Sequence, residues 1–291
     1  MESAFANSAP TPHAQWRRTR LTVAGIAIAA FELGPLAGPT IVLIHGLGHW
    51  TDAAWGRLAP LLAEDYRIVA FDLPGFGESE RPDASYDLPF FRLISTGVLD
   101  ALAPVPVALI GHSLGGMIAA DLAATMPERF DRLALIDPAG FLRAPRLFVK
   151  LIASPLAGGL FSIRPSRRFV KRTLDQSVFD PTANDAALHA RAYELASDPG
   201  VRRAFARVYS GAMQELLDLQ ALHARFARFD KPTKIIWGRD DRFVPIKGVE
   251  QARRTYPHAD VQILARAGHC PMIEHPHQVA RALLSFIETP V

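Results

Sequence analysis

The stretch VPVALIGHSLGG, residues 105–116, decides the fold. Its first six residues are almost all apolar, which predicts a strand buried on both faces. The small, apolar residues that follow, 117–124, predict a helix. Ser113 lies at the junction, and a direct turn from strand to helix forces its central residue into a strained conformation between small neighbours. The pattern therefore predicts a serine whose side chain stands alone at the end of a strand.

Apolar runs of similar length recur on both sides of this turn. Each is followed by Gly, Pro or Asp within a few residues and most alternate with helical patterns; they cover residues 41–44, 67–71, 133–136, 234–237 and 261–264. Such an alternation predicts an α/β fold with a mainly parallel sheet flanked by helices. Residues 21–31, broken at Gly25, predict an antiparallel hairpin at the sheet edge.

The alternation stops between Gly140 and Gly211, where helical patterns follow one another over residues 165–176, 183–196 and 200–209. We interpret residues 141–211 as an inserted helical cap, or lid, over the edge of the sheet where ligands bind in open α/β folds. The core domain then comprises residues 16–140 and 212–291. Residues 1–15 are small and polar and predict a flexible tail.

Composition narrows the class of protein. Of 291 residues, 49% are hydrophobic and 21% charged, as in globular proteins with a large core. The net charge of +3 does not predict a nucleic-acid partner. The single cysteine, Cys270, excludes an internal disulfide and suits a reducing compartment. Neither a signal-peptide pattern nor an apolar run of about 18 residues is present. We expect a cytoplasmic protein, monomeric or dimeric.

A serine hydroxyl needs a neighbouring base to become a nucleophile. Two downstream segments can supply a base and an acid: GRDDRFVP, residues 238–245, and GHCPMIEHP, residues 268–276. Each follows a predicted strand. His275 and His277 with Glu274 could suggest a metal site, but the chain offers no further ligands near them, so we predict a helix start and no metal.

These segments, with HGLG (45–48), DLPGFGES (72–79) and GHSLGG (111–116), resemble the α/β-hydrolase superfamily, specifically its capped esterase, lipase and C–C hydrolase branch. The resemblance implies an α/β-hydrolase fold, Ser113 as nucleophile, His269 as general base and Asp241 as the acid that orients it. Asp240 and Asp137 remain alternative acids. No cofactor is implied.

The resemblance also implies an oxyanion hole made of the backbone amides of Leu47 and Leu114. The Leu114 amide would lie at a helix N-terminus, where backbone N–H groups favour negative charge. Trp50, Phe141 and Met117 are candidate substrate-binding residues.

A serine nucleophile excludes the chemistry of haloalkane dehalogenases and epoxide hydrolases, which need a carboxylate. Hydrolases of ring-cleavage products typically carry Asn before the serine and Trp after the histidine, where this chain has His112 and Cys270. This difference favours hydrolysis of a small-molecule carboxylic ester through an acyl-enzyme on Ser113. C–C bond hydrolysis of ring-cleavage-type diketones, or a non-catalytic ligand-binding role, are the alternatives.

The predicted cap carries a basic segment. Residues 141–172 contain eight basic side chains and no acid, namely Arg143, Arg146, Lys150, Arg164, Arg167, Arg168, Lys171 and Arg172. Large apolar residues lie between them, and we expect these to pack on the core as a pocket roof. Basic amphipathic segments also bind membrane interfaces, so weak contact with an anionic membrane is a second expectation.

Overall fold

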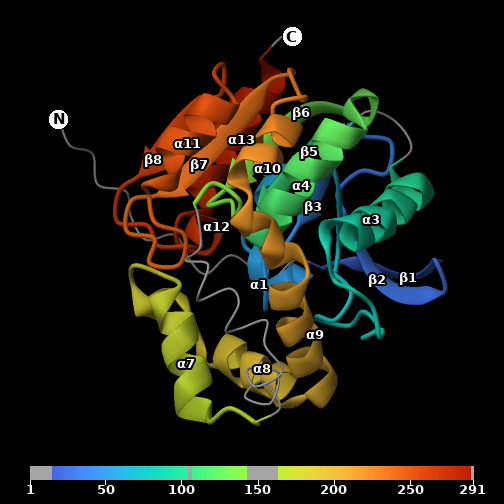
Figure 1. The fold of residues 1–291 in the computed structure, drawn as a ribbon, viewed down its shortest axis with the longest axis vertical. Coiled ribbons are helices and arrows are strands. Elements are labelled where there is room, and N and C mark those ends of the chain that lie inside the picture. The colour runs from blue at the N-terminus through green and yellow to red at the C-terminus, as the bar shows by residue number, and fades with distance from the viewer. Residues whose placement is uncertain (1–14, 104–106, 143–162, 290–291) are drawn as a thin grey trace.

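The computed structural model describes residues 15–103, 107–142 and 163–289. Its eight strands form one sheet in the order β1-β2-β4-β3-β5-β6-β7-β8 (Figure 1). The central strand β5 (Val107–His112) ends directly before Ser113. The remaining strands are β1 (Arg17–Val23), β2 (Ile26–Leu33), β3 (Thr40–Ile44), β4 (Arg67–Phe71), β6 (Phe130–Ile136), β7 (Thr233–Gly238) and β8 (Asp260–Leu264).

Strand direction follows the expectation. From β4 through β8 the neighbouring strands are parallel, whereas β1 and β2 form an antiparallel hairpin that joins the sheet antiparallel to β4. The hairpin turns at Ala24 and Gly25, both with positive φ, which suits the right-handed twist of the two strands. The α/β-hydrolase fold class is thereby confirmed.

Both faces of the sheet are covered, which explains why the strands are apolar throughout. In β3, Val42 and Ile44 belong to one apolar layer and Ile41 and Leu43 to the other. The first layer includes α3 (Leu88–Leu102), α4 (Leu114–Thr125), α10 (Leu219–Phe226) and α11 (Gly248–Thr255). The second includes α1 (Thr51–Trp55), α2 (Ala59–Leu62), α12 (Pro271–Glu274) and α13 (Pro276–Glu288).

Between β6 and α10, the described residues form the α-helices α7 (Arg167–Gln176), α8 (Ala186–Ser197) and α9 (Pro199–Ser210). They lie together at the lower end of Figure 1. Phe76 lies in the loop that follows β4. Phe205 of α9 packs edge-on against it, with ring centroids 5.6 Å apart. Helix α9 therefore contacts the loop at the carboxyl end of β4. The domain limits 16–140, 141–211 and 212–291 stay a prediction, and most of the predicted tail lies outside the described residues.

No helix in the described ranges is long and apolar enough to cross a membrane.

The close approach of α4 to β3 makes a glycine necessary at position 115. A Cβ there would overlap the carbonyl oxygen of Ile44 and lie 2.5 Å from that of His45. We expect Gly115→Ala to lower the free energy of unfolding by about 2–3 kcal/mol, because overpacking of this kind shifts backbone. Chemical denaturation measures the loss.

Gly25→Ala is the matched control. Its Cβ would meet no atom within 4 Å, so only the left-handed backbone at φ +80° opposes it, at a cost of about 1 kcal/mol. Equal losses in the two variants would contradict the packing argument.

Candidate active site

Ser113 occupies the strained turn between β5 and α4. Its φ of 54° and ψ of −118° are unfavourable for a residue with a side chain, at a cost of about 1–3 kcal/mol. Hydrogen bonds hold this conformation from both sides. The Ser113 amide donates to the carbonyl of Ile136 at 3.0 Å, and its carbonyl accepts from the amides of Met117 and Ala139 at 3.1 and 3.0 Å.

The structure brings Ser113, His269 and Asp241 together from the ends of three strands. Nε2 of His269 lies 2.9 Å from Oγ of Ser113, and Nδ1 lies 2.7 Å from Oδ2 of Asp241. A carboxylate can only accept, so Nδ1 carries the proton and Nε2 is left to accept from the serine hydroxyl. This is the arrangement of a nucleophile, a general base and an orienting acid.

Backbone amides fix the carboxylate of Asp241. Its Oδ1 accepts from Phe243 at 2.7 Å and from Val244 at 2.9 Å, and the side chain is buried. Asp240, one of the alternative acids, is half-buried, and Nδ1 of His269 donates its hydrogen bond to Asp241 instead. Asp137, the other alternative, is fully buried beside the pair.

The backbone amides of Leu47 and Leu114, the predicted oxyanion hole, belong to two segments that adjoin the turn at Ser113. Leu114 is the first residue of α4. The loop that carries Leu47 packs against the turn at Ser113, since a Cβ on Gly46 would lie 2.9 Å from Cβ of Ser113. Within the described chain, neither amide donates a hydrogen bond. Both are therefore available to a developing oxyanion.

His45 and Asp72 hold this loop in place. Nδ1 of His45 donates to the carbonyl of Gly46 at 2.8 Å, and Nε2 accepts from the amide of Leu73 at 2.9 Å. Burial lowers the pKa of His45, in keeping with a neutral ring that both donates and accepts. Asp72 accepts from the amide of Thr51 at 2.7 Å, where α1 begins. His45 is thus a structural residue.

His112 has a role that the sequence did not reveal. Its Nε2 donates to the backbone carbonyl of His269 at 2.7 Å across 157 residues of sequence. Burial, followed by the charges of neighbouring histidines, lowers the pKa of His112 far below its usual value and that of His49 to about 3. Both rings are therefore neutral. No sequence spacing could have indicated this bond.

Cys270 follows the base directly and is fully buried. Its Sγ lies 3.9 Å from Nε2 of His49. Burial raises the pKa of the Cys270 thiol well above its usual value. A thiol that stays protonated is a poor nucleophile, so Cys270 is a packing residue.

The loop that carries His269 is tied to the segment following α7. The amide of His269 donates to the carbonyl of Ser177 at 2.7 Å. The carboxylate of Glu274 accepts from Gly268 at 2.7 Å and from Phe179 at 2.6 Å. Glu274 thus joins the histidine loop to the cap. His275, from the same motif, makes a local hydrogen bond: its Nε2 lies 2.8 Å from the backbone carbonyl of Arg266.

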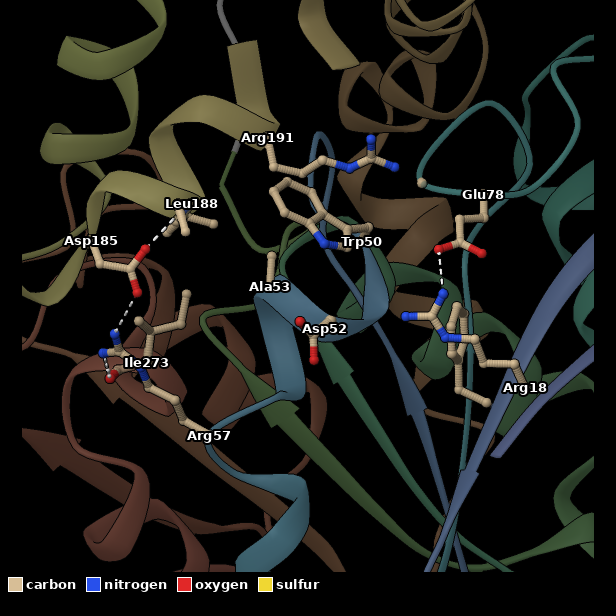
Figure 2. Close-up of a pocket in the computed structure, with 13 residues that line it drawn as sticks. Arg18, Trp50, Asp52, Ala53, Arg57, Glu78, Asp185, Leu188, Arg191 and Ile273 are labelled. Atoms are coloured by element: carbon tan, nitrogen blue, oxygen red, sulfur yellow. Dashed lines mark hydrogen bonds and ion pairs between the residues drawn. The ribbon is translucent and has the colours of Figure 1, made fainter. Parts of the chain in front are cut away.

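The three candidate substrate-binding residues differ in position. Trp50 is half-buried and lines a cavity of about 370 Å³ between α1, β1 and α8 (Figure 2). Arg18, Arg57 and Arg191 surround it, whereas the catalytic triad does not line it. Met117 and Phe141 are at most 1% exposed. Phe141 stacks on His223 inside the core. Contact of these three residues with substrate stays a prediction.

Phe243 was missed by sequence reasoning. Its ring is 46% exposed and its centroid lies 5.5 Å from that of His269. A large exposed aromatic beside the base is suited to contact a bound substrate. Its place in GRDDRFVP, two residues after the acid, was the available signal.

One cluster of potential metal ligands occurs among the described residues. Oxygen atoms of Asp137 and Asp241 and a ring nitrogen of His269 lie within 4.8 Å of one another. Hydrogen bonds already engage His269 Nδ1 with Asp241, and Asp137 with the amide of Gly238. The network of hydrogen bonds explains this cluster without a metal.

Comparison with known proteins gives the class. The model of the alpha/beta hydrolase family matches residues 41–282. The chain therefore belongs to the alpha/beta hydrolase family, as its sheet and the three residues at the strand ends indicate.

The chain is similar to hydrolases of two kinds. The chain is 31% identical to a 2-hydroxymuconate semialdehyde hydrolase of Pseudomonas sp. (strain CF600) over 274 residues, 92% of each chain. Among solved structures, a bacterial membrane phospholipase A superposes with a TM-score of 0.79 and 31% identity over 94% of this chain and 86% of its own. The 2-hydroxy-6-oxo-6-phenylhexa-2,4-dienoate hydrolase of Rhodococcus sp. strain RHA1 has the same TM-score, at 25% identity over 94% and 99%.

Substitution of the triad tests the roles that the geometry suggests. Ser113→Ala and His269→Ala should each remove nearly all turnover, and Asp241→Asn should cost somewhat less. Because the three act as a unit, a double variant should be scarcely worse than Ser113→Ala alone. Steady-state kinetics, with thermal melts as a folding control, provide the measurement. Full activity in Asp241→Asn would mean that the acid is another residue.

Proposed function

We propose that this hydrolase cleaves a C–C bond next to a carbonyl group in a 2-hydroxy-6-oxo-dienoate, the type of compound that forms on ring cleavage. The observation that carries the proposal is the similarity to a 2-hydroxymuconate semialdehyde hydrolase over 92% of both chains. A serine, histidine and aspartate in hydrogen-bonding order support it.

The structure weakens the sequence argument for an ester substrate. That argument rested on His112 and Cys270, which replace Asn and Trp of the ring-cleavage hydrolases. Both side chains are fully buried. His112 donates to a backbone carbonyl, and Cys270 lies beside His49. Residues in these positions support the base rather than contact substrate, so they carry no preference for an ester.

In the proposed mechanism, Oγ of Ser113 attacks the substrate carbonyl while Nε2 of His269 takes the hydroxyl proton. The amides of Leu47 and Leu114 hold the oxyanion, and Asp241 stabilises the imidazolium. The C–C bond then breaks in the 2-oxo tautomer of the substrate, in which the proton of the 2-hydroxyl group has moved to the carbon next to the 6-oxo group. The electron pair of the broken bond stays on that carbon, where conjugation with the enone delocalises it. His269 returns its proton to this fragment.

Water completes the reaction. With His269 again acting as base, a water molecule attacks the acyl ester on Ser113 and releases a carboxylic acid. An ester would follow the same steps, with an alkoxide as leaving group in place of a carbanion. The two activities therefore differ in the leaving group and in the tautomerisation that the carbanion requires, and the same triad serves the acyl transfer in both.

Hydrolysis of carboxylic esters, phospholipids included, is the second candidate. The likeness to the membrane phospholipase A structure, at 31% identity and a TM-score of 0.79, favours it. The two candidates make different demands on the substrate pocket, since a dienoate is a short, planar anion and a lipid ester carries long acyl chains.

A direct comparison of substrates separates the two. We expect kcat/KM for 2-hydroxy-6-oxo-6-phenylhexa-2,4-dienoate to exceed that for any p-nitrophenyl ester in a series of rising chain length. Loss of dienoate absorbance and release of p-nitrophenol are the measurements, with Ser113→Ala as control for both. Turnover of the esters without turnover of the dienoate would favour the second candidate. If fluorophosphonate failed to label the wild-type protein, the assignment of a serine hydrolase would be wrong.

We also propose that α7 makes weak contact with anionic membranes. Arg168 and Arg172, four residues apart, are exposed, and neither side chain forms a hydrogen bond or an ion pair with another residue that the structure describes. Phe169 between them is 63% exposed. Arg167 instead stacks 4.3 Å from the ring centroid of Tyr193, and Lys171 pairs with Asp175 at 2.5 Å. Arg143, Arg146 and Lys150 lie outside the described residues.

Each cation near an anionic bilayer contributes about 1 kcal/mol. We therefore expect Arg168→Gln/Arg172→Gln to weaken binding to anionic vesicles about tenfold or more at low salt. Arg228→Gln/Arg253→Gln, which removes two exposed arginines elsewhere, should leave binding unchanged. Co-sedimentation with anionic and neutral vesicles at two salt concentrations is the measurement. Equal binding to both vesicle types, or none, would leave α7 without this role.

A further inference from the structure

Asp137 is a buried carboxyl group that the mechanism above does not use. It directly follows β6, has a positive φ of 42°, and is inaccessible to solvent. Its Oδ1 accepts from the amide of Gly238 at 2.8 Å, and its Oδ2 has no hydrogen-bond partner among the described residues. An oxygen of Asp137 lies within 4.8 Å of both Asp241 and His269.

Two carboxyl groups this close and this deeply buried cannot both be ionised at ordinary cost. The negative charge belongs on Asp241, because two amides and Nδ1–H of His269 donate to it. Asp137 receives one amide only. Burial first, and then the charge of Asp241, raise the pKa of Asp137 well above its usual value.

A protonated Asp137 has one hydrogen to donate. Oδ2 of Asp137 is the atom without a partner, and the carboxylate of Asp241 offers an acceptor oxygen within 4.8 Å of the Asp137 carboxyl group. The other titratable groups around Asp137 are His269, Cys270 and Glu274, from the segment after β8. Cys270 is a protonated thiol, and Glu274 is engaged by backbone amides. Neither offers Asp137 a compensating positive charge.

We propose that Asp137 is a positioning residue: a neutral carboxylic acid that donates a hydrogen bond to Asp241 and so holds the carboxylate against His269. The inference rests on the triad of the proposed function and is independent of which substrate the triad cleaves. It also gives the roles of the two neighbouring aspartates, one charged and one neutral. An ionised catalytic acid at position 137 is the competing assignment.

Substitution by an amide distinguishes these assignments. The side chain in Asp137→Asn would keep an acceptor for the amide of Gly238 and an N–H donor for Asp241, so we expect this variant to react with fluorophosphonate within about twofold of the wild-type rate. Asp137→Ala removes the donor and should slow the reaction at least tenfold. Asp240→Asn and Asp240→Ala are the matched controls and should change little. The reaction of Ser113 with the probe does not depend on the natural substrate.

The outcomes are distinct. Loss of reactivity in Asp137→Asn comparable to that in Asp241→Asn would overturn the proposal, because only an ionised acid is disabled by an amide. Wild-type reactivity in Asp137→Ala would overturn it as well. Reduced reactivity in Asp137→Ala supports it only if thermal melts show a folded protein and Asp137→Asn restores the rate. Failure of the proposed dienoate activity would leave these rates unaffected.

Two further measurements report the proton on the Asp137 carboxyl group directly. They remain informative even if the Asp137→Ala variant is inactive. The infrared carbonyl band of a protonated carboxylic acid at neutral pH should be present in the wild type and missing in Asp137→Asn. A difference spectrum without that band would overturn the proposal.

The second measurement is stability against pH. Because the pKa of Asp137 is higher in the folded than in the unfolded chain, where it is about 3.9, the folded state holds the extra proton above pH 4. Wild-type stability therefore falls as pH rises through this range, whereas an asparagine side chain has no proton to lose. The melting temperature of Asp137→Asn relative to wild type should rise between pH 4 and pH 8. A constant or falling difference would show that Asp137 is ionised in the folded protein.

Discussion

The left-handed turn at Ser113 is the constraint on which the rest of this structure depends. A serine at φ 54° persists only because neighbouring backbone holds it from both sides, through the carbonyl of Ile136 and the amides of Met117 and Ala139. The same turn makes Leu114 the first residue of α4 and brings the serine hydroxyl within 2.9 Å of Nε2 of His269. It also requires β3 and α4 to approach so closely that position 115 has no room for a side chain.

Around this turn lies a densely buried cluster of polar side chains, several of which are uncharged. His49 and His112 are neutral because burial lowers their pKa values, and the thiol of Cys270 is protonated because burial raises its own. The carboxylate of Asp241 accepts three hydrogen bonds, from the amides of Phe243 and Val244 and from Nδ1 of His269. His269 is hydrogen-bonded to the carboxylate of Asp241. The electrostatic effect of this carboxylate on the histidine is large because the site excludes water.

Much of the fold could be predicted because its signals are local. The apolar runs, the small residues around Ser113 and the break at Gly25 indicated a parallel sheet with an edge hairpin. The ends of the strands were predicted less well. β5 continues to His112 and β2 to Leu33, beyond the apolar runs, because a strand extends as far as it pairs with its neighbours, whatever its hydrophobicity. The substrate preference inferred from His112 and Cys270 was weakened, since neither side chain reaches solvent.

By itself, the sequence determined the class of fold and the three residue types of the triad, because motif order and strand periodicity are written along the chain. The tertiary structure alone decided which partners they meet. The bond from His112 to the carbonyl of His269, the anchoring of the histidine loop by Glu274, and the approach of Asp137 to Asp241 join segments distant in sequence. Burial and mutual distance set the protonation of such groups, and neither quantity exists until the strands are assembled side by side.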